Sequence, residues 1–292
     1  MQQRSLGPGA RDVTAISFGG MPLSIQGRPD DDVAIRVVHS VLDAGVTLLD
    51  TADVYCLDAT DYGHNERLFA KALGSWSGAR DDIVVATKGG MTRPAGRWER
   101  NGRPEHLKRA CERSLDALGV ECIDLYQFHA PDPRVPFADS VGALAKLQEE
   151  GKIKWVGLSN VTVEQIDEAG TMVQVVSIQN RLNPFFREAI DTGVVRHCTD
   201  RGIGFLAYSP VGGGRLNKKL PTHSVVAPIA ERLGASPHAV VEAWVKAQGP
   251  NVIVLAAGRT IEHALDSLTA DGLELTADDL TAIDAAEFST AR

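Results

Sequence analysis

Four side chains able to handle protons and charge stand at or just beyond the ends of short apolar runs. Asp50, Lys88 and His129 each close such a run, and Tyr55 follows Asp50 in the next polar stretch. Carboxyl ends of parallel strands open on the same side of a sheet, so we expect the four to lie close together. A phenol has an ordinary pKa of about 10 and is a poor acid–base group at neutral pH unless a nearby cation lowers that pKa.

The chemistry that fits this set is reduction of a carbonyl by hydride, because hydride arrival leaves an alkoxide that needs a proton. We expect Lys88 to lower the pKa of Tyr55 and Asp50 to hold Lys88 charged. His129 would donate a hydrogen bond that polarises and orients the carbonyl. Each residue alone also has a structural interpretation: Asp50 as a loop cap, Lys88 as a solvated lysine, His129 as a core histidine. Their occurrence together on separate strands favours a catalytic set.

Two alternative functions also fit the sequence. Lys88 at a strand end also suits a Schiff-base enzyme of the aldolase type, in which the lysine is the nucleophile. The other alternative is a non-catalytic protein that serves a partner protein. The presence of Asp50, Tyr55, Lys88 and His129 argues against a site that has lost its activity.

The hydrophobic periodicity alternates between strands and helices along the chain. Gly7-Pro8-Gly9 predicts the turn of an N-terminal hairpin over residues 4–16. Helices are expected over residues 30–44, 65–73, 104–118, 139–150, 190–201 and 236–248, and in two amphipathic stretches, 261–270 and 277–287. A further helix is expected after Thr162, which with Gln165 resembles a capping box. Strands are expected over residues 13–18, 47–50, 83–88, 123–128, 153–158, 173–178, 204–207 and 252–256. About eight strand–helix units with continuous apolar strands predict a (β/α)8 barrel with an N-terminal β-hairpin.

Composition narrows the function classes. The chain has 292 residues and is 43% hydrophobic, which suits one barrel domain over residues 1–292. A net charge of −8 argues against general nucleic-acid binding, since neutralising phosphates needs clustered cations. No apolar run reaches the roughly 18 residues of a membrane span. The four cysteines form no CxxC pair and no metal-ligand spacing, so we expect free thiols, no metal site and a cytoplasmic protein.

Several motifs together resemble the aldo-keto reductase family along nearly the whole chain. They are residues 50–55 (Asp-Thr-Ala-Asp-Val-Tyr), the pair Gly63 and Glu66, residues 123–129 (Ile-Asp-Leu-Tyr-Gln-Phe-His), residues 150–160 (Glu-Gly-Lys-Ile-Lys-Trp-Val-Gly-Leu-Ser-Asn) and residues 208–212 (Tyr-Ser-Pro-Val-Gly). The resemblance implies the barrel fold, a small-molecule carbonyl substrate, NADPH as hydride donor, and Asp50, Tyr55, Lys88 and His129 as the catalytic tetrad. A non-catalytic relative would instead bind NADPH as a redox sensor and serve a partner protein. Residues 102–107 (Gly-Arg-Pro-Glu-His-Leu) suggest the bacterial group that includes pyridoxal reductase-like enzymes.

The same resemblance implies a cofactor site. Ser159, Asn160 and Gln179 would hold the nicotinamide carboxamide, and Tyr208 would stack on its ring. The loop from Ser209 to Leu216 would hold the pyrophosphate through backbone N–H groups, which suits its glycine-rich sequence. The full set of cofactor residues is Gly20, Met21, Ser159, Asn160, Gln179, Tyr208, Ser209, Pro210, Val211, Gly212, Gly214, Arg215, Gly258 and Arg259. The sequence holds no GxGxxG after a strand, so a Rossmann site is not supported.

The sequence departs from the family pattern at two places. Residues 56–62 are inserted after Tyr55, so Tyr62 competes for the acid role. Near the C-terminus, residues 255–259 read Leu-Ala-Ala-Gly-Arg, and Ser267 stands where the family has an asparagine. Arg259 would bind a 2′-phosphate and favour NADP over NAD. Met21, Trp98 and residues 130–136 are expected to line the mouth on the substrate side. The sequence gives neither the identity of the substrate nor the oligomeric state.

Overall fold

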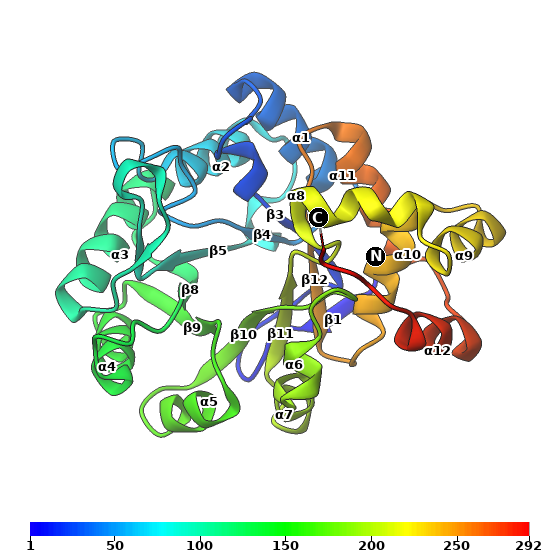
Figure 1. Cartoon of the computed structure of the whole chain (residues 1–292). Coiled ribbons are helices and arrows are strands. Elements are labelled where there is room, and N and C mark those ends of the chain that lie inside the picture. Colours follow the sequence, from blue (N-terminus) through cyan, green and yellow to red (C-terminus); the bar gives the residue numbers. More distant parts are fainter. Residues whose placement is uncertain (292) are drawn as a thin grey trace.

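The chain forms a closed barrel of eight parallel strands surrounded by helices, described for residues 1–291 of a computed structural model (Figure 1). Around the barrel the strand order is β10-β11-β12-β3-β4-β5-β8-β9. The strands are β3 (Ile16–Gly19), β4 (Leu48–Asp50), β5 (Val84–Gly89), β8 (Ile123–Phe128), β9 (Ile153–Ser159), β10 (Val175–Arg181), β11 (Gly204–Tyr208) and β12 (Val252–Ala256). The predicted (β/α)8 barrel is confirmed.

Helices connect the strands and cover the outside of the barrel (Figure 1). They are α1 (Asp31–Asp43), α2 (His64–Ser75), α3 (Pro104–Leu118), α4 (Phe137–Glu149), α5 (Val163–Gly170), α6 (Glu188–Asp191), α7 (Val194–Asp200), α8 (Gly213–Leu216), α9 (Val226–Leu233), α10 (Pro237–Lys246), α11 (Ile261–Leu268) and α12 (Ala277–Ala285). Short 3-10 turns accompany them, including η3 (Pro94–Gly96) and η4 (Asn217–Thr222). Thr162 and Gln165 form a capping box at the start of α5, which stabilises the first turn of that helix.

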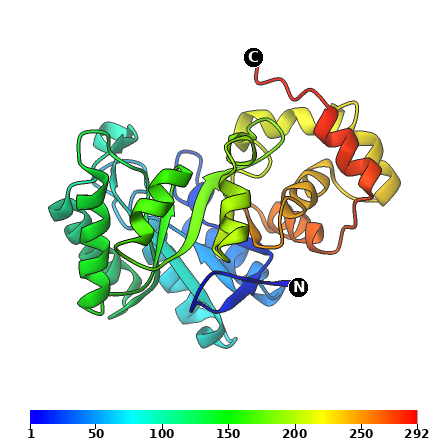
Figure 2. The same ribbon diagram turned by 90° about the horizontal axis from the view of Figure 1, so that it is seen from below.

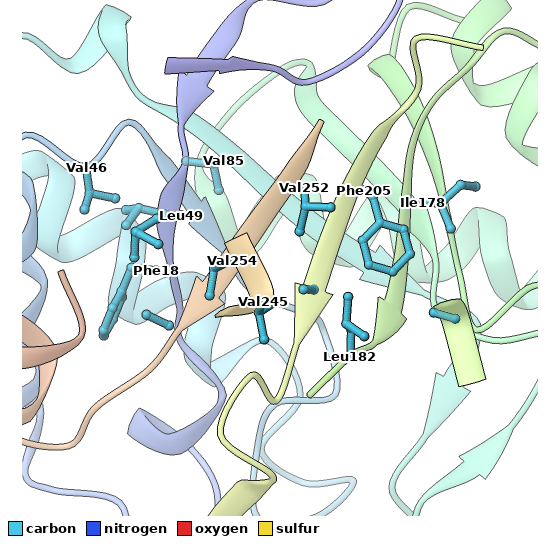
Figure 3. Close-up of a cluster of buried hydrophobic side chains, with 14 of the residues drawn as sticks. Phe18, Val46, Leu49, Val85, Ile178, Leu182, Phe205, Val245, Val252 and Val254 are labelled. Carbon is cyan, nitrogen blue, oxygen red and sulfur yellow. The ribbon is translucent and has the colours of Figure 1, made fainter. Parts of the chain in front are cut away.

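Each barrel strand carries two apolar faces, because successive side chains of a strand point to opposite sides. One face packs under the helices, where Phe18, Leu49 and Val85 belong to a large buried cluster (Figure 3). The other face fills the barrel interior, where Leu48 and Val84 belong to a second cluster. Polar residues at inward-facing positions near the carboxyl ends of the strands therefore lie at that open end of the barrel, the barrel mouth.

The N-terminal hairpin closes the opposite end of the barrel. Its strands β1 (Gln3–Ser5) and β2 (Asp12–Thr14) pair antiparallel, as expected, and Leu6 at the turn is fully buried. Leu6 packs with Val84, Val176 and other residues of the interior cluster. Figure 2 shows the hairpin (dark blue) far from the C-terminal segment (red).

Three local predictions were wrong. The strand expected over residues 13–18 is divided into β2 and β3, because β2 pairs with β1 whereas β3 joins the barrel. The helix expected over residues 190–201 is interrupted at Gly193, whose φ of 78° is left-handed. The loop expected from Ser209 to Leu216 holds the short helix α8 over its last four residues. Within residues 1–291, no helix combines the length and apolar character needed to cross a membrane.

Candidate active site

Inward-facing positions alternate along each strand, and at the carboxyl ends of β4 and β5 these positions hold candidate catalytic residues. In β4, Leu48 points inward and Asp50 continues the same face at the strand end. In β5, Val84 and Ala86 point inward, so Lys88 continues their row. The sheet register pairs Asp50 with Ala86, which places the two charged side chains on neighbouring strands.

Lys88 lies at the centre of the site and is fully buried. Its Nζ donates hydrogen bonds to Asp50 Oδ1 at 2.5 Å, to the Thr51 carbonyl at 2.8 Å and to the Tyr55 hydroxyl at 3.1 Å. Burial alone would lower the pKa of Lys88, but the charges of Asp50 and Tyr55 and the hydrogen bonds to them raise it above its ordinary value. Lys88 is therefore a protonated ammonium at neutral pH.

Asp50 is held by two amides as well as by Lys88. Its Oδ2 accepts hydrogen bonds from Gln127 Nε2 at 3.0 Å and from Gln179 Nε2 at 2.8 Å. Gln179 Nε2 also lies 3.1 Å from Gln127 Oε1, so the two amides form one network. This network fixes the carboxylate that in turn fixes Lys88.

Tyr55 lies in the loop after β4 and is 7% exposed. Its ring packs edge-on against His129, with centroids 5.8 Å apart, and against Trp98, at 6.3 Å. Burial raises the pKa of Tyr55 and outweighs the opposing effect of Lys88, so the pKa lies above its ordinary value. The expectation of a net lowered pKa was therefore wrong for this structure. Tyr55 is a protonated phenol at neutral pH, the form that can donate a proton.

His129 faces the same phenol from the end of β8. Its side chain is 8% exposed, and burial together with the nearby charge of Lys88 holds its pKa well below its ordinary value. Within residues 1–291 its Nδ1 has no hydrogen-bond partner. A neutral imidazole still carries one N–H, which can donate a hydrogen bond to a carbonyl oxygen.

Tyr62, the competing tyrosine, is engaged elsewhere. Its hydroxyl oxygen accepts a hydrogen bond from the backbone N–H of Arg93 at 2.8 Å, and the guanidinium of Arg113 lies over its ring at 5.3 Å. Among the described contacts, Lys88 donates to Tyr55 and not to Tyr62. The hydroxyl of Tyr55 therefore has a cationic hydrogen-bond partner, whereas the cation beside Tyr62 lies over its ring and not at its hydroxyl.

The residues expected around a nicotinamide ring lie at the ends of β9, β10 and β11. Ser159 Oγ donates to the Gln179 carbonyl at 2.7 Å. Asn160 has a left-handed φ of 58°, and its Nδ2 donates to the His129 carbonyl at 2.9 Å while its Oδ1 accepts from the Tyr208 hydroxyl at 2.8 Å. Because Gln179 gives its N–H groups to Asp50 and Gln127, its Oε1 is the atom left to accept from a carboxamide. The donors and acceptors present fit that group.

The glycine-rich loop after β11 begins with Ser209, whose φ of 52° is left-handed, and continues through Pro210 and Val211. Gly212 and Gly213 also have positive φ values, 85° and 74°. A Cβ on Gly213 or Gly214 would meet nothing within 4 Å, so a pyrophosphate has room to approach this backbone. Arg215 donates instead to the carbonyls of residues 290 and 291 in the C-terminal segment, which runs beside α8 (Figures 1 and 2).

The remaining candidate cofactor residues lie where β3 and β12 end. Gly20 packs against Asn65, since a Cβ there would lie 2.4 Å from Asn65 Oδ1, and Met21 follows it in a 3-10 turn. Gly258 packs against the first turn of α11. Arg259 is exposed and donates to the carbonyls of Pro22 at 3.1 Å and Gln26 at 2.8 Å.

Comparisons with known proteins give the family of the chain. The model of the aldo/keto reductase family matches residues 15–287. The chain belongs to this family. An aldo-keto reductase of Strobilurus tenacellus is 32% identical over 93% of this chain and 88% of its own length. Among solved structures, a glycerol dehydrogenase of Gluconobacter oxydans has a TM-score of 0.82 and 28% identity over 97% of this chain and 93% of its own. An aldose reductase of Giardia lamblia has a TM-score of 0.74 and 26% identity over 92% and 90%.

As an aldo/keto reductase, the protein is an NAD(P)H-dependent oxidoreductase. The narrower group suggested by residues 102–107 stays a prediction.

Sequence reasoning missed two contributors to the site of this aldo/keto reductase. Gln127 binds Asp50 from β8, and the Thr51 carbonyl accepts from Lys88. Gln127 was detectable, because it continues the inward row of Leu125 and is an amide within an otherwise apolar strand. A backbone carbonyl carries no such signal, since every residue has one.

Proposed function

We propose that this aldo/keto reductase reduces an aldehyde or ketone to the alcohol with NADPH, and runs the reverse reaction with an alcohol. The observation that carries the proposal is the Tyr55 hydroxyl 3.1 Å from Lys88 Nζ, at the mouth of the barrel. NADPH, when bound, supplies the hydride that adds to the carbonyl carbon. The protein's own residues supply the proton and the electrostatic support.

Tyr55 acts as the general acid. Its O–H bond breaks as the proton passes to the carbonyl oxygen, and the phenolate that remains is stabilised by the ammonium of Lys88. Asp50 keeps that ammonium charged and in place. His129 donates a hydrogen bond to the carbonyl oxygen, which favours the developing negative charge. A proton from solvent then restores the phenol.

The hydrogen-bond donors and acceptors around the barrel mouth can be assigned to the parts of NADPH. Ser159, Asn160 and Gln179 would bind the carboxamide, and Tyr208 would stack on the ring. The backbone around Gly212 would bind the pyrophosphate. Arg259 would bind the 2′-phosphate of NADPH, which requires it to leave the carbonyls of the loop after β3. This residue is the basis for proposing NADP rather than NAD.

A Schiff-base mechanism is disfavoured by the state of Lys88. A nucleophilic lysine must lose its proton, whereas the pKa of Lys88 is raised and its ammonium has three acceptors. A non-catalytic role is disfavoured because Asp50, Lys88 and Tyr55 form a connected set. We further propose one domain over residues 1–292. A cytoplasmic location also stays a proposal, supported by four free cysteines, all of them within the described residues.

The decisive experiment compares two tyrosine variants. Tyr55→Phe should lower kcat for 4-nitrobenzaldehyde by about 100-fold or more, the usual contribution of a general acid, with NADPH affinity nearly unchanged. Tyr62→Phe is the matched control and should keep most of the activity, because its hydroxyl serves the backbone of Arg93. NADPH absorbance follows turnover and fluorescence titration measures binding. Retained activity in Tyr55→Phe with loss in Tyr62→Phe would transfer the acid role to Tyr62.

A further inference from the structure

A buried arginine binds the backbone directly after the proposed acid and takes no part in the proposed reduction. Arg93 follows β6 (Met91–Thr92) in the loop after β5, and its side chain is 1% exposed. Its guanidinium carbon lies 3.9 Å from the ring centroid of Trp98. The position is internal, although arginine is rarely buried unless it is paired.

The hydrogen-bond donors of Arg93 are only partly used. Nη2 donates to the carbonyls of Cys56 at 3.1 Å and Leu57 at 3.2 Å. Nε and Nη1 are buried and have no hydrogen-bond partner among the described residues. These two nitrogens together offer three N–H groups.

The charge of Arg93 is also unpaired. Among residues 1–291, no carboxylate lies within 4.0 Å of its guanidinium. The charge of Arg93 helps to lower the pKa of Asp58, but the two form no ion pair, and two other nearby carboxylates have their own cations. Asp61 pairs with Arg28 at 2.6 Å, and Asp53 pairs with Arg113 at 3.2 Å. Burying a charge without a counter-charge is costly, so such a group calls for an explanation.

The position of Arg93 relates it to the reacting atoms. The carbonyl that it holds belongs to Cys56, which directly follows Tyr55 in the chain. Trp98 lies between the two side chains, in contact with the guanidinium on one side and edge-on to the Tyr55 ring on the other. Trp98 is 43% exposed whereas the Arg93 side chain that it stacks on is 1% exposed, so Trp98 lies on the solvent side of the pair.

We propose that Arg93 is a specificity residue that binds an anionic oxygen group, a carboxylate or a phosphate, on the carbonyl substrate. Trp98 is the cover that moves aside as this group enters. The substrate class is therefore an aldehyde or ketone with an acidic group at its far end. This inference rests on the proposed reduction, because the anionic group is placed relative to a carbonyl at Tyr55.

The test uses three aldehydes with the same ring: 4-formylbenzoate, 4-formylphenyl phosphate and the neutral methyl 4-formylbenzoate. The wild-type protein should reduce at least one anionic aldehyde with a kcat/KM about tenfold or more above that of the ester, as expected for hydrogen bonds to a charged group. Which anion is preferred distinguishes a carboxylate subsite from a phosphate subsite. Equal kcat/KM for all three in the wild type would overturn the proposal without any variant.

The variants locate the effect. Arg93→Gln should lower kcat/KM for the preferred anion about tenfold or more while changing the ester less than about threefold. Arg93→Lys should restore part of the preference. Arg97→Gln is the matched control, because Arg97 lies in the same loop, is exposed and pairs with Glu99; it should leave the preference unchanged. Equal losses on all three aldehydes in Arg93→Gln would show a structural role and overturn the proposal.

Binding separates this inference from the reduction itself. Calorimetry without NADPH should show 4-formylbenzoate or 4-formylphenyl phosphate binding the wild type about tenfold more tightly than Arg93→Gln. If no aldehyde is reduced but this difference persists, the proposed function fails and the anion subsite stands. If reduction proceeds but neither anion shows the difference in kcat/KM or in binding, the subsite fails and the reductase stands.

Discussion

At the scale of single residues, the site depends on a buried ion pair whose hydrogen bonds are complete. Lys88 donates to three acceptors, and the second oxygen of Asp50 accepts from Gln127 and Gln179. Desolvating two charges costs several kcal/mol per ion, and their attraction offsets this only when the remaining donors and acceptors are satisfied. This network meets that condition, and the raised pKa of Lys88 keeps its ammonium charged beside Tyr55.

The pKa shifts predict the pH dependence of reduction. Tyr55 must be protonated to act as an acid, and its pKa is raised, so activity is present below that pKa and is lost only as pH rises through it. His129 has a lowered pKa and is already neutral above it, so no histidine inflection should appear near its ordinary value of about 6.5. We therefore expect kcat for 4-nitrobenzaldehyde to stay level from about pH 6 to 9 and to fall only near or above the ordinary tyrosine value of about 10. A fall in kcat centred near neutral pH would contradict this assignment.

The residues that sequence reasoning predicted best are those fixed by strand periodicity. Asp50, Lys88 and His129 lie at or within one residue of strand ends, and the alternation of inward positions brings Asp50 and Lys88 into contact. The direction of the Tyr55 pKa shift was not predictable, because it depends on how completely the folded loops bury the phenol. The free donors of Arg93 were not predictable either, because they follow from long-range packing against residues 56–57 and Trp98.

At the scale of elements, the barrel strands followed from apolar runs, whereas the segments beyond β11 did not. Helix α8 is short and begins with two glycines, which have low helix propensity. Contacts with the C-terminal segment accompany it: Arg215 and Lys219 donate to carbonyls of residues 289–291, and His223 stacks on Phe288 with ring centroids 4.1 Å apart. These contacts join residues far apart in the sequence, so local propensity carries no signal for them.

The loops after β3 and β12 give a prediction for cofactor choice. Arg259 links them by donating to the carbonyls of Pro22 and Gln26. If it turns to a 2′-phosphate, Arg259→Ala should weaken NADPH binding about tenfold or more, the value of a charge-assisted hydrogen bond, and change NADH binding much less. Fluorescence titration with both cofactors measures this. An equal loss for NADPH and NADH would assign Arg259 to linking the loops and remove it from phosphate binding.

At the scale of the whole molecule, the two ends of the barrel have separate tasks. The mouth holds the charged network, and the hairpin β1–β2 closes the other end with the buried side chain of Leu6. The backbone there is tightly packed, since a Cβ on Gly204 would lie 2.3 Å from the Leu6 carbonyl oxygen. Stability and chemistry should therefore respond to different substitutions.

Two glycines of the hairpin turn test that separation. Gly7 has a φ of 140°, and an added Cβ would lie 1.8 Å from the Val176 carbonyl oxygen, so Gly7→Ala must displace the hairpin from the barrel. We expect it to lower the free energy of unfolding by about 3 kcal/mol or more. Gly9→Ala is the matched control: Gly9 also has a positive φ, 72°, but the nearest atom is a Gln174 side-chain oxygen at 3.5 Å. It should cost only the backbone strain of about 1–2 kcal/mol.

Urea unfolding measures both variants, and kcat of the folded fraction should match the wild type in each, because the hairpin lies at the end of the barrel away from Tyr55 and Lys88. Equal destabilisation by the two substitutions would mean that the contact with Val176 does not hold the hairpin in place. If kcat falls although the protein is fully folded, the two ends of the barrel are coupled. The coupling would pass through the inward-facing side chains of β4 and β5, which lead from Leu48 to Asp50 and from Val84 to Lys88. A lower free energy of unfolding with unchanged kcat would show that a displaced hairpin does not alter the site at the other end of the barrel.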